Sequence, residues 1–453
     1  MRRTAAALVL AASAASAVPA LAGNSNTFHI GARAAGMGGA YTAMAEEGSV
    51  AWYNPAGLGY NDRSSVDVSA SAFFLELVQV PGLLRTVMPS GAVTPSDFST
   101  SSFQVVPTSL SYVMRLGDGK GGGPRHSLAL SVFVPQSVKY ASSLVVGSKE
   151  TAGDYRQKLA VEDVATRYLL GPSWGIAIGR WAVGASLYAT YGLETRRAEF
   201  YQDVARPEGS HFFALNGGAM TVTELGLAWA VGAQCRATDR LRVGLVIRPP
   251  SMRLYRSVDG SWLEARSLPA RDDPARIVSE FEETRASGST FSARMASPLS
   301  FAFGAAWLDE GRFAVSADAD YALPFRDDEE GIDRKGVFNA RAGAEIWLAP
   351  RWAIEFGAFT DFSPERSASS LASKRVDFYG ASLAVSRLSA YDVTGSDKTD
   401  RITFASTFGV RYAFGYGEMG GLDVLPATDE SRRKRPAAMI HDISVIVGTS
   451  MQF

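Results

Sequence analysis

Hydrophobic and polar residues alternate with a period of two along most of the chain. The segment 181–193, WAVGASLYATYGL, has an apolar residue at every odd position, and 338–348, FNARAGAEIWL, has one at every even position. The last residues, 441–453, alternate in the same way. Alternation over about ten residues, with one apolar face and one small or polar face, is typical of a transmembrane β-strand.

About fourteen such segments follow one another, and they predict strands over 64–73, 103–115, 125–135, 162–178, 181–199, 221–236, 240–256, 292–308, 312–325, 336–348, 351–362, 375–388, 401–415 and 438–453. Short connections alternate along most of the chain with long ones, expected as external loops over 74–102, 136–161, 200–220, 257–291, 326–335, 363–374 and 416–437. This alternation and an even strand number are what a closed single-chain barrel requires. The predicted fold class is therefore all-β, a transmembrane antiparallel β-barrel of about 14 strands.

Tryptophan placement agrees with a barrel. Trp181, Trp307, Trp347 and Trp352 each lie within a few residues of a short connection. An aromatic girdle at one membrane interface has this arrangement.

Composition narrows the class of function. The 45 basic and 46 acidic residues nearly cancel, which leaves no electrostatic footprint for nucleic acid. Cys235 is the only cysteine, so no internal disulfide can form. The four histidines are widely spaced and form no HExxH motif. We therefore expect no catalytic residues, no metal site, no cofactor and no enzyme activity.

The N-terminus predicts export. Residues 1–22 contain Arg2 and Arg3, an apolar run and Ala20-Leu21-Ala22, which together read as a cleaved signal peptide. We therefore divide the chain into a signal peptide (1–22), an N-terminal segment (23–62) and a barrel with long extracellular loops (63–453), located in the bacterial outer membrane.

The N-terminal segment has neither a helical nor a strand period. Its core, 31–58, reads GARAAGMGGAYTAMAEEGSVAWYNPAGL. A barrel of about fourteen strands is wider than its own side chains fill, and glycines permit close approach to the wall. The segment is therefore predicted to form a plug, or hatch, inside the lumen.

These residues resemble the FadL/TodX family of outer-membrane transport proteins for long-chain fatty acids and other hydrophobic compounds. The resemblance lies in Gly36-Met37-Gly38-Gly39-Ala40, in Glu46-Glu47 and in Asn54-Pro55-Ala56; looser matches lie at 297–307 and 338–364. It implies an N-terminal hatch in a fourteen-stranded barrel, with hatch-motif residues Gly36, Gly38, Gly39, Glu46, Glu47, Asn54, Pro55 and Ala56. It also implies a groove that catches ligand, an interior pocket, and release through a hatch shift and a lateral exit.

Two apolar runs fall in stretches expected to be external loops, and they are candidates for the hydrophobic ligand. They are 73–88 and 211–220, and they contribute Phe73, Phe74, Leu75, Leu77, Val78, Leu83, Leu84, Phe212, Phe213 and Leu215. Packing of these runs over each other as a lid is the alternative interpretation.

Arginines on the polar faces of the strands are candidates for the head group of an anionic amphiphile, because guanidinium binds carboxylate in a bidentate manner. They are Arg242, Arg248, Arg341 and Arg411, with a structural ion-pair network as the alternative. Pro135 is the candidate for a strand interruption, since proline cannot donate to the ladder.

The sequence therefore predicts an outer-membrane channel for passive uptake of hydrophobic or amphipathic molecules, most specifically long-chain fatty acids. Outer-membrane lipid and lipopolysaccharide are the other expected partners, the latter through the basic run 431–436, for which a solvated surface is the alternative. Two other functions stay open: a partner barrel of a secretion or surface-attachment system, and a general porin.

Overall fold

A computed structural model describes residues 24, 27–44, 47–88, 90–116, 124–150, 153–207, 209, 211–269, 276–309, 311–368, 371, 373–394, 399–425 and 430–453. The signal-peptide prediction for residues 1–22 lies outside these residues. The helical elements are α2 (Ala32–Gly36), α3 (Val50–Tyr53) and the 3-10 helix η1 (Pro55–Tyr60). The strands are β1 (Ser65–Val87), β2 (Val93–Leu116), β3 (Arg125–Glu150), β4 (Gly153–Ile178), β5 (Trp181–Ala205), β6 (His211–Arg236), β7 (Leu241–Arg248), β8 (Met252–Pro269), β9 (Ile277–Met295), β10 (Ser300–Asp309), β11 (Phe313–Ala322), β12 (Phe325–Asp327), β13 (Ile332–Arg334), β14 (Val337–Ala349), β15 (Trp352–Asp361), β16 (Lys374–Thr394), β17 (Thr399–Met419), β18 (Gly421–Leu425), β19 (Glu430–Lys434) and β20 (Ala437–Gln452).

The strands confirm the predicted fold class. Eighteen of them form one sheet, in which β1 pairs with β20 and thereby closes a barrel. Because β6 pairs with both β7 and β8, these two form one interrupted wall strand, and β9 and β10 form another. The hairpin β18–β19 is not counted as part of the wall. The barrel therefore has 14 antiparallel wall strands.

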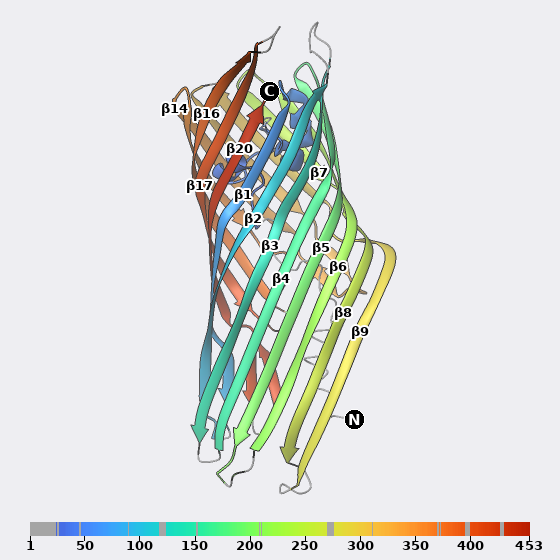
Figure 1. Ribbon diagram of the computed structural model, residues 1–453, viewed down its shortest axis with the longest axis vertical. Helices are drawn as coiled ribbons and strands as arrows, with labels where there is room; N and C mark the ends of the chain where they lie inside the picture. Colours follow the sequence, from blue (N-terminus) through green and yellow to red (C-terminus); the bar gives the residue numbers. More distant parts are fainter. Residues whose placement is uncertain are drawn as a thin grey trace.

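Strand lengths divide the barrel into two halves. The short connections, the C-terminus and the helical elements lie at one end, which we call the short-turn end (Figure 1). We call the opposite end the long-strand end. Strands β2 to β6 are each at least 24 residues long and extend far toward it, whereas β10, β11 and β15 are each only 10 residues long. The wall is therefore tall on one side and low on the other.

Most residues expected in long loops are in fact strand. The run 73–88 lies mainly in β1, where 74–79 pair with both β2 and β20, and the run 211–220 lies in β6. The loop prediction was wrong because it rested on a lost period of two. In β1 the register with β2 shifts between Ser71 and Phe74 and between Val80 and Leu84, so the period of two is lost there although backbone pairing persists. Two expected strands are broken instead: 240–256 at residues 249–251, and 292–308 at 296–299.

An apolar core fills part of the long-strand end. Its buried residues include Val78, Leu83 and Leu84 of β1, together with Phe378 of β16 and Met419 of β17. The apolar run of β1 therefore packs within the barrel. The two apolar runs meet at Met88 and Phe212, whereas the other core partners of 73–88 belong to other strands.

Candidate functional site

Residues 27–61 pack inside the barrel at the short-turn end, and we call them the hatch (Figure 1). Asn54 is at its centre and is fully buried. The Asn54 side chain accepts a hydrogen bond from Ala56 N (3.1 Å) and donates to Thr42 O (2.9 Å) and to Ala233 O of β6 (3.2 Å). One amide thus caps η1, ties two parts of the hatch together and joins both to the wall.

The wall approaches the hatch at glycines. A Cβ added to Gly232 would lie 1.9 Å from Asn54 Oδ1, and one added to Gly244 would lie 2.3 Å from Thr42 O. Several inward-facing glycines of successive strands have equally close hatch contacts: Gly175, Gly184, Gly304, Gly343 and Gly357. Any side chain at these positions would push the hatch away from the wall. The sequence contained this signal, as glycines on the polar faces of predicted strands.

Buried polar groups of the wall hold the hatch backbone. Asp318 accepts hydrogen bonds from Tyr41 N and Thr42 N, both at 2.8 Å, and Gln234 donates to Met44 O at 2.8 Å. Donors and acceptors of the short, irregular hatch segments are thereby satisfied without regular secondary structure.

The remaining hatch-motif residues have distinct positions. Gly36 contacts Glu355, and its carbonyl accepts a hydrogen bond from Ser382 (2.7 Å). Gly38 and Gly39 have positive φ angles of 64° and 77°, which glycine adopts without strain. Glu47 also has a positive φ, 69°. Glu46 lies outside the described residues. Pro55 is the first residue of η1, where its missing N–H costs nothing.

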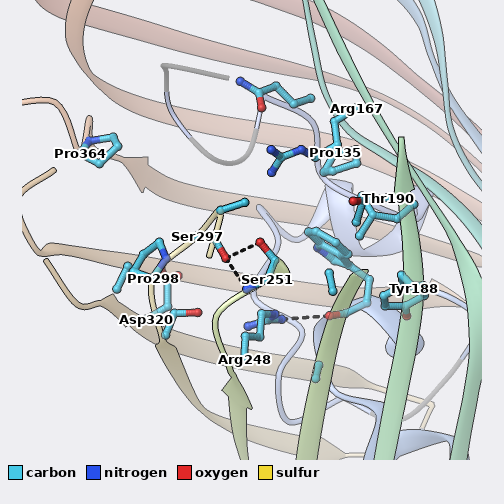
Figure 2. Close-up of a pocket in the computed structure, with 18 of the residues that line it drawn as sticks. Pro135, Arg167, Tyr188, Thr190, Arg248, Ser251, Ser297, Pro298, Asp320 and Pro364 are labelled. Carbon is cyan, nitrogen blue, oxygen red and sulfur yellow. Dashed lines mark hydrogen bonds between the residues drawn. The ribbon is translucent and has the colours of Figure 1, made fainter. Parts of the chain in front are cut away.

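A cavity of about 300 Å³ lies between the hatch and the wall, on the long-strand side of the hatch. Phe28, His29 and Trp52 of the hatch line it from one side, and residues of β3 to β8, β10, β11 and β14 line the rest. Its surface is mostly apolar, and its lining includes several arginines, of which Figure 2 labels Arg167 and Arg248. We call it the central cavity.

The four arginines predicted for a head group do not converge on one site. Arg248 and Arg341 line the central cavity, but Arg248 donates to Trp52 O (2.9 Å) and Arg341 pairs with Asp320 (2.6 Å). Arg411 lines a smaller polar cavity of about 50 Å³, together with Lys374 and Asp442. Arg242 lines neither cavity.

The sequence analysis missed Arg167, which lines the central cavity from β4 (Figure 2). No ion pair or hydrogen bond joins its guanidinium to another residue in the part of the chain that the structure describes. Arg167 lies within the predicted strand 162–178. Its position in the alternation of that strand was the signal that could have identified it as a residue of the lumen.

The predicted apolar ligand residues lie outside the central cavity. Phe74 packs on Phe28, with ring centroids 5.1 Å apart, and Phe212 is buried beside Met88. The remaining candidates are either in the core described above (Val78, Leu83, Leu84), exposed (Phe73, Phe213) or partly exposed (Leu75, Leu77, Leu215). Phe74 is the one that reaches the hatch.

Pro135 lies at an interruption of the wall. The β2–β3 pairing ends at Ser109↔Phe133, and the β3–β4 register shifts between Phe133 and Gln136. We call this interruption the β3 break. Phe28 of the hatch fills it: its N–H donates to Pro135 O (3.2 Å), and its ring packs with Phe74, Val106 and Val134.

His29 follows Phe28 and lines the same cavity. Burial lowers the pKa of His29 well below its ordinary value, and the guanidinium groups of Arg411 and Arg341 lower it further. Its ring packs edge-on against Phe359 at 4.6 Å. The imidazole is therefore neutral when the hatch is seated.

Metal-binding and helical membrane-spanning features are missing from the described ranges. No cluster of three or more His, Cys, Asp or Glu side chains there has an arrangement that could hold a metal ion. No helix in the same ranges is long and apolar enough to cross a membrane.

Comparisons with known proteins bear on the fold. No protein-family model and no curated protein sequence matches the chain. A crystal structure of a Pseudomonas aeruginosa FadL homologue superposes with a TM-score of 0.57 over 94% of this chain and 99% of that one, at 10% identity. The chain has the fold of a FadL-type barrel. At these identities the likeness concerns the fold alone.

Two further structures score lower and add nothing to this assignment. The Ralstonia pickettii toluene transporter TbuX matches at a TM-score of 0.49 and 12% identity, covering 94% of this chain and 98% of that one. The CymD monoaromatic hydrocarbon channel matches at 0.48 and 14%, with the same coverage.

Proposed function

We propose that this protein is an outer-membrane channel for the passive uptake of hydrophobic or amphipathic molecules, and that long-chain fatty acids are its main ligands. The short-turn end is then periplasmic and the long-strand end extracellular, as in bacterial barrels with short periplasmic turns. The observation that supports this proposal most is the central cavity, a mostly apolar space on the long-strand side of the hatch, whose wall includes Arg167, an arginine without an ion pair among the described residues.

The residues around the central cavity suit an anionic amphiphile. Leu169, Ala228 and Ala302 offer apolar surface to a hydrocarbon chain. Arg167 offers a charge-assisted, bidentate contact to a carboxylate. Arg248 and Arg341 are already engaged, so Arg167 is the preferred head-group residue of this proposal.

Release would follow hatch movement. Phe28 occupies the β3 break, and Asn54, Pro55 and Ala56 anchor the hatch to β6. A shift of the hatch would withdraw Phe28 and open a lateral path from the central cavity past Pro135 into the membrane. A general porin needs an open eyelet, so a hatch seated in the lumen argues against that function.

One observation favours a second candidate, a partner-binding barrel of a secretion or attachment system. β9 pairs with β8 on one side, and 18 of its 19 residues are exposed. Within the described residues no strand pairs with its other edge, and such an edge can accept a partner strand.

The test is lipid analysis of the purified protein, paired with growth on long-chain fatty acids. The protein is compared with the Arg167→Gln variant and with a matched control, Arg285→Gln, which removes an exposed arginine of β9. We expect a co-purified amphiphile and a growth requirement that Arg167→Gln weakens and Arg285→Gln does not. Absence of both a bound amphiphile and a growth defect in the deletion strain would contradict the proposal.

A further inference from the structure

The wall has a second interruption, between β6 and the wall strand formed by β7 and β8. β6 pairs with β8 as far as Leu227↔Met252, and with β7 from Val231↔Ile247 onward. Residues 228–230 of β6 therefore have no partner on this side, although they pair with β5 on the other. Opposite them stands Pro249-Pro250-Ser251, in which two residues lack an N–H and cannot complete a ladder.

The neighbouring wall strand is interrupted beside it. β9 ends at Met295 and β10 begins at Ser300. Ser251 and Ser297 are joined by a hydroxyl–hydroxyl hydrogen bond of 2.8 Å (Figure 2). Ala296 N donates to Ser251 O, also at 2.8 Å. These bonds connect the two interruptions to each other but do not connect either of them to β6. We call the opening between 228–230 and 249–251 the β6 window.

The central cavity extends into this window. Successive residues of a strand face opposite sides of the wall. Glu224, Ala228 and Ala230 face the lumen, whereas Leu225 and Trp229 face outward, and all five line the cavity. Leu225 is 44% exposed. The cavity therefore reaches the β6 backbone at residues 228–230, where no partner strand pairs on this side.

Outward-facing aromatic residues place the window in the membrane. One row across neighbouring strands contains Tyr168, Tyr191, Leu225, Tyr255 and Phe291, as the pairings of β4, β5, β6, β8 and β9 show. Tyr191 follows Trp181 by ten residues on β5, and a strand needs about 9–11 residues to cross a membrane. The row is therefore an outer aromatic girdle, opposite the tryptophans of the short-turn end.

Trp229 lies four residues from Leu225 toward the short-turn end, below the girdle. The β6 window thus opens at the level of the outer leaflet. In the described residues, the hatch contacts at its edges lie on the lumen side: Arg248 donates to Trp52 O and Tyr53 O, and Ala228 packs against the apolar cluster of the hatch.

We infer that the β6 window is a lateral intake port, through which apolar molecules dissolved in the outer leaflet reach the central cavity without hatch movement. The inference rests on the proposed function for its ligand class. It adds a route: intake through the β6 window and release through the β3 break.

The test blocks the window from outside. Cys235 is the only cysteine, so C235S gives a background without thiols. In this background the Trp229→Cys variant places one thiol in the window. Leu187→Cys is the matched control, because Leu187 is the register partner of Trp229 on β5, faces the lipid and is 48% exposed. Each variant, reconstituted in liposomes, is measured before and after labelling with a bulky, bilayer-soluble thiol reagent.

Labelling at position 229 should reduce the rate of fatty-acid uptake by about tenfold relative to the same variant unlabelled, and labelling at 187 should leave the rate unchanged. Equal rates at 229 before and after complete labelling would overturn the inference. If the unlabelled C235S protein takes up no fatty acid, the proposed function fails instead, so the two failures are distinguishable.

Discussion

The β3 break and the β6 window are two interruptions of one wall, and they differ in what fills them. Both lie beside proline, at Pro135 and at Pro249-Pro250, and both open on the central cavity. Phe28 of the hatch fills the first. At the second, the hatch contacts of the described residues lie on the lumen side. The same backbone device therefore gives a gated opening where a hatch side chain packs between its edges, and an ungated opening where the hatch stays on the lumen side.

The difference between the two openings depends on a hatch that is seated inside the barrel. The Gly232→Leu substitution should unseat it. The leucine side chain would overlap Asn54, so we expect the hatch to leave its position and the β3 break to become ungated as well. The measurement is single-channel conductance, with uptake of a large polar antibiotic as the cellular readout. Conductance should rise from near zero to that of an open pore.

Val231→Leu is the control, because the adjacent Val231 faces outward and is 52% exposed. A closed pore in Gly232→Leu would show that the close approach of hatch and wall does not keep the hatch seated.

Phe28→Ala should open the β3 break alone. Removing a buried phenylalanine costs about 3–5 kcal/mol, and here the cost falls on the contact of the hatch with Phe74, Val106 and Val134. We expect faster release of bound fatty acid, with intake unchanged, in a stopped-flow assay that separates the two steps. Phe28→Leu should retain most of the wild-type rate. If Phe28→Ala accelerated intake and release equally, the assignment of this break to release would be wrong.

Arg167 should affect both routes through the cavity they share. Hydrogen bonds to charged groups contribute about 1.5–3 kcal/mol, so Arg167→Gln should weaken binding of a long-chain carboxylate by about 10- to 100-fold. Binding of the corresponding neutral alcohol should change little. Titration calorimetry on the purified protein measures both ligands, with Arg285→Gln as control. An equal loss for acid and alcohol would assign Arg167 a role in packing rather than in charge recognition.

Acid should loosen the hatch beside the β3 break. His29 has a lowered pKa when the hatch is seated and an ordinary value of about 6.5 when it is unseated. Its contribution to stability is therefore fully present above about pH 6.5 and is lost as the pH falls toward the lowered value. Hydrogen exchange of hatch amides, corrected for the intrinsic pH effect, should show reduced protection at low pH.

The His29→Phe variant lacks the ionisable ring and should flatten this pH dependence. The same pH profile in the variant and the wild type would exclude His29 as its source.

The sequence predicted the wall better than the site. The alternation in segments such as 181–193 indicates which face of a strand contacts lipid, and it can be recognised from a single sequence. The hatch was predicted from glycines and Asn54-Pro55-Ala56, which have a direct physical role at the wall. The resemblance implied an interior pocket, but the lining of the central cavity was not predicted, because it comes from many strands and Arg167 acquires its position only from their register.

The β6 window was also beyond sequence reasoning. The segment 240–256 reads as one strand, and only the pairing of β6 with two separate partners reveals the interruption at 249–251.

The most direct test of the central claim is a crystal structure with a long-chain fatty acid that carries bromine at its terminal carbon. The account predicts an anomalous bromine peak within the central cavity and the carboxylate in contact with the Arg167 guanidinium. Bromine density confined to the outer wall, or a central cavity filled only with water at saturating ligand, would contradict it.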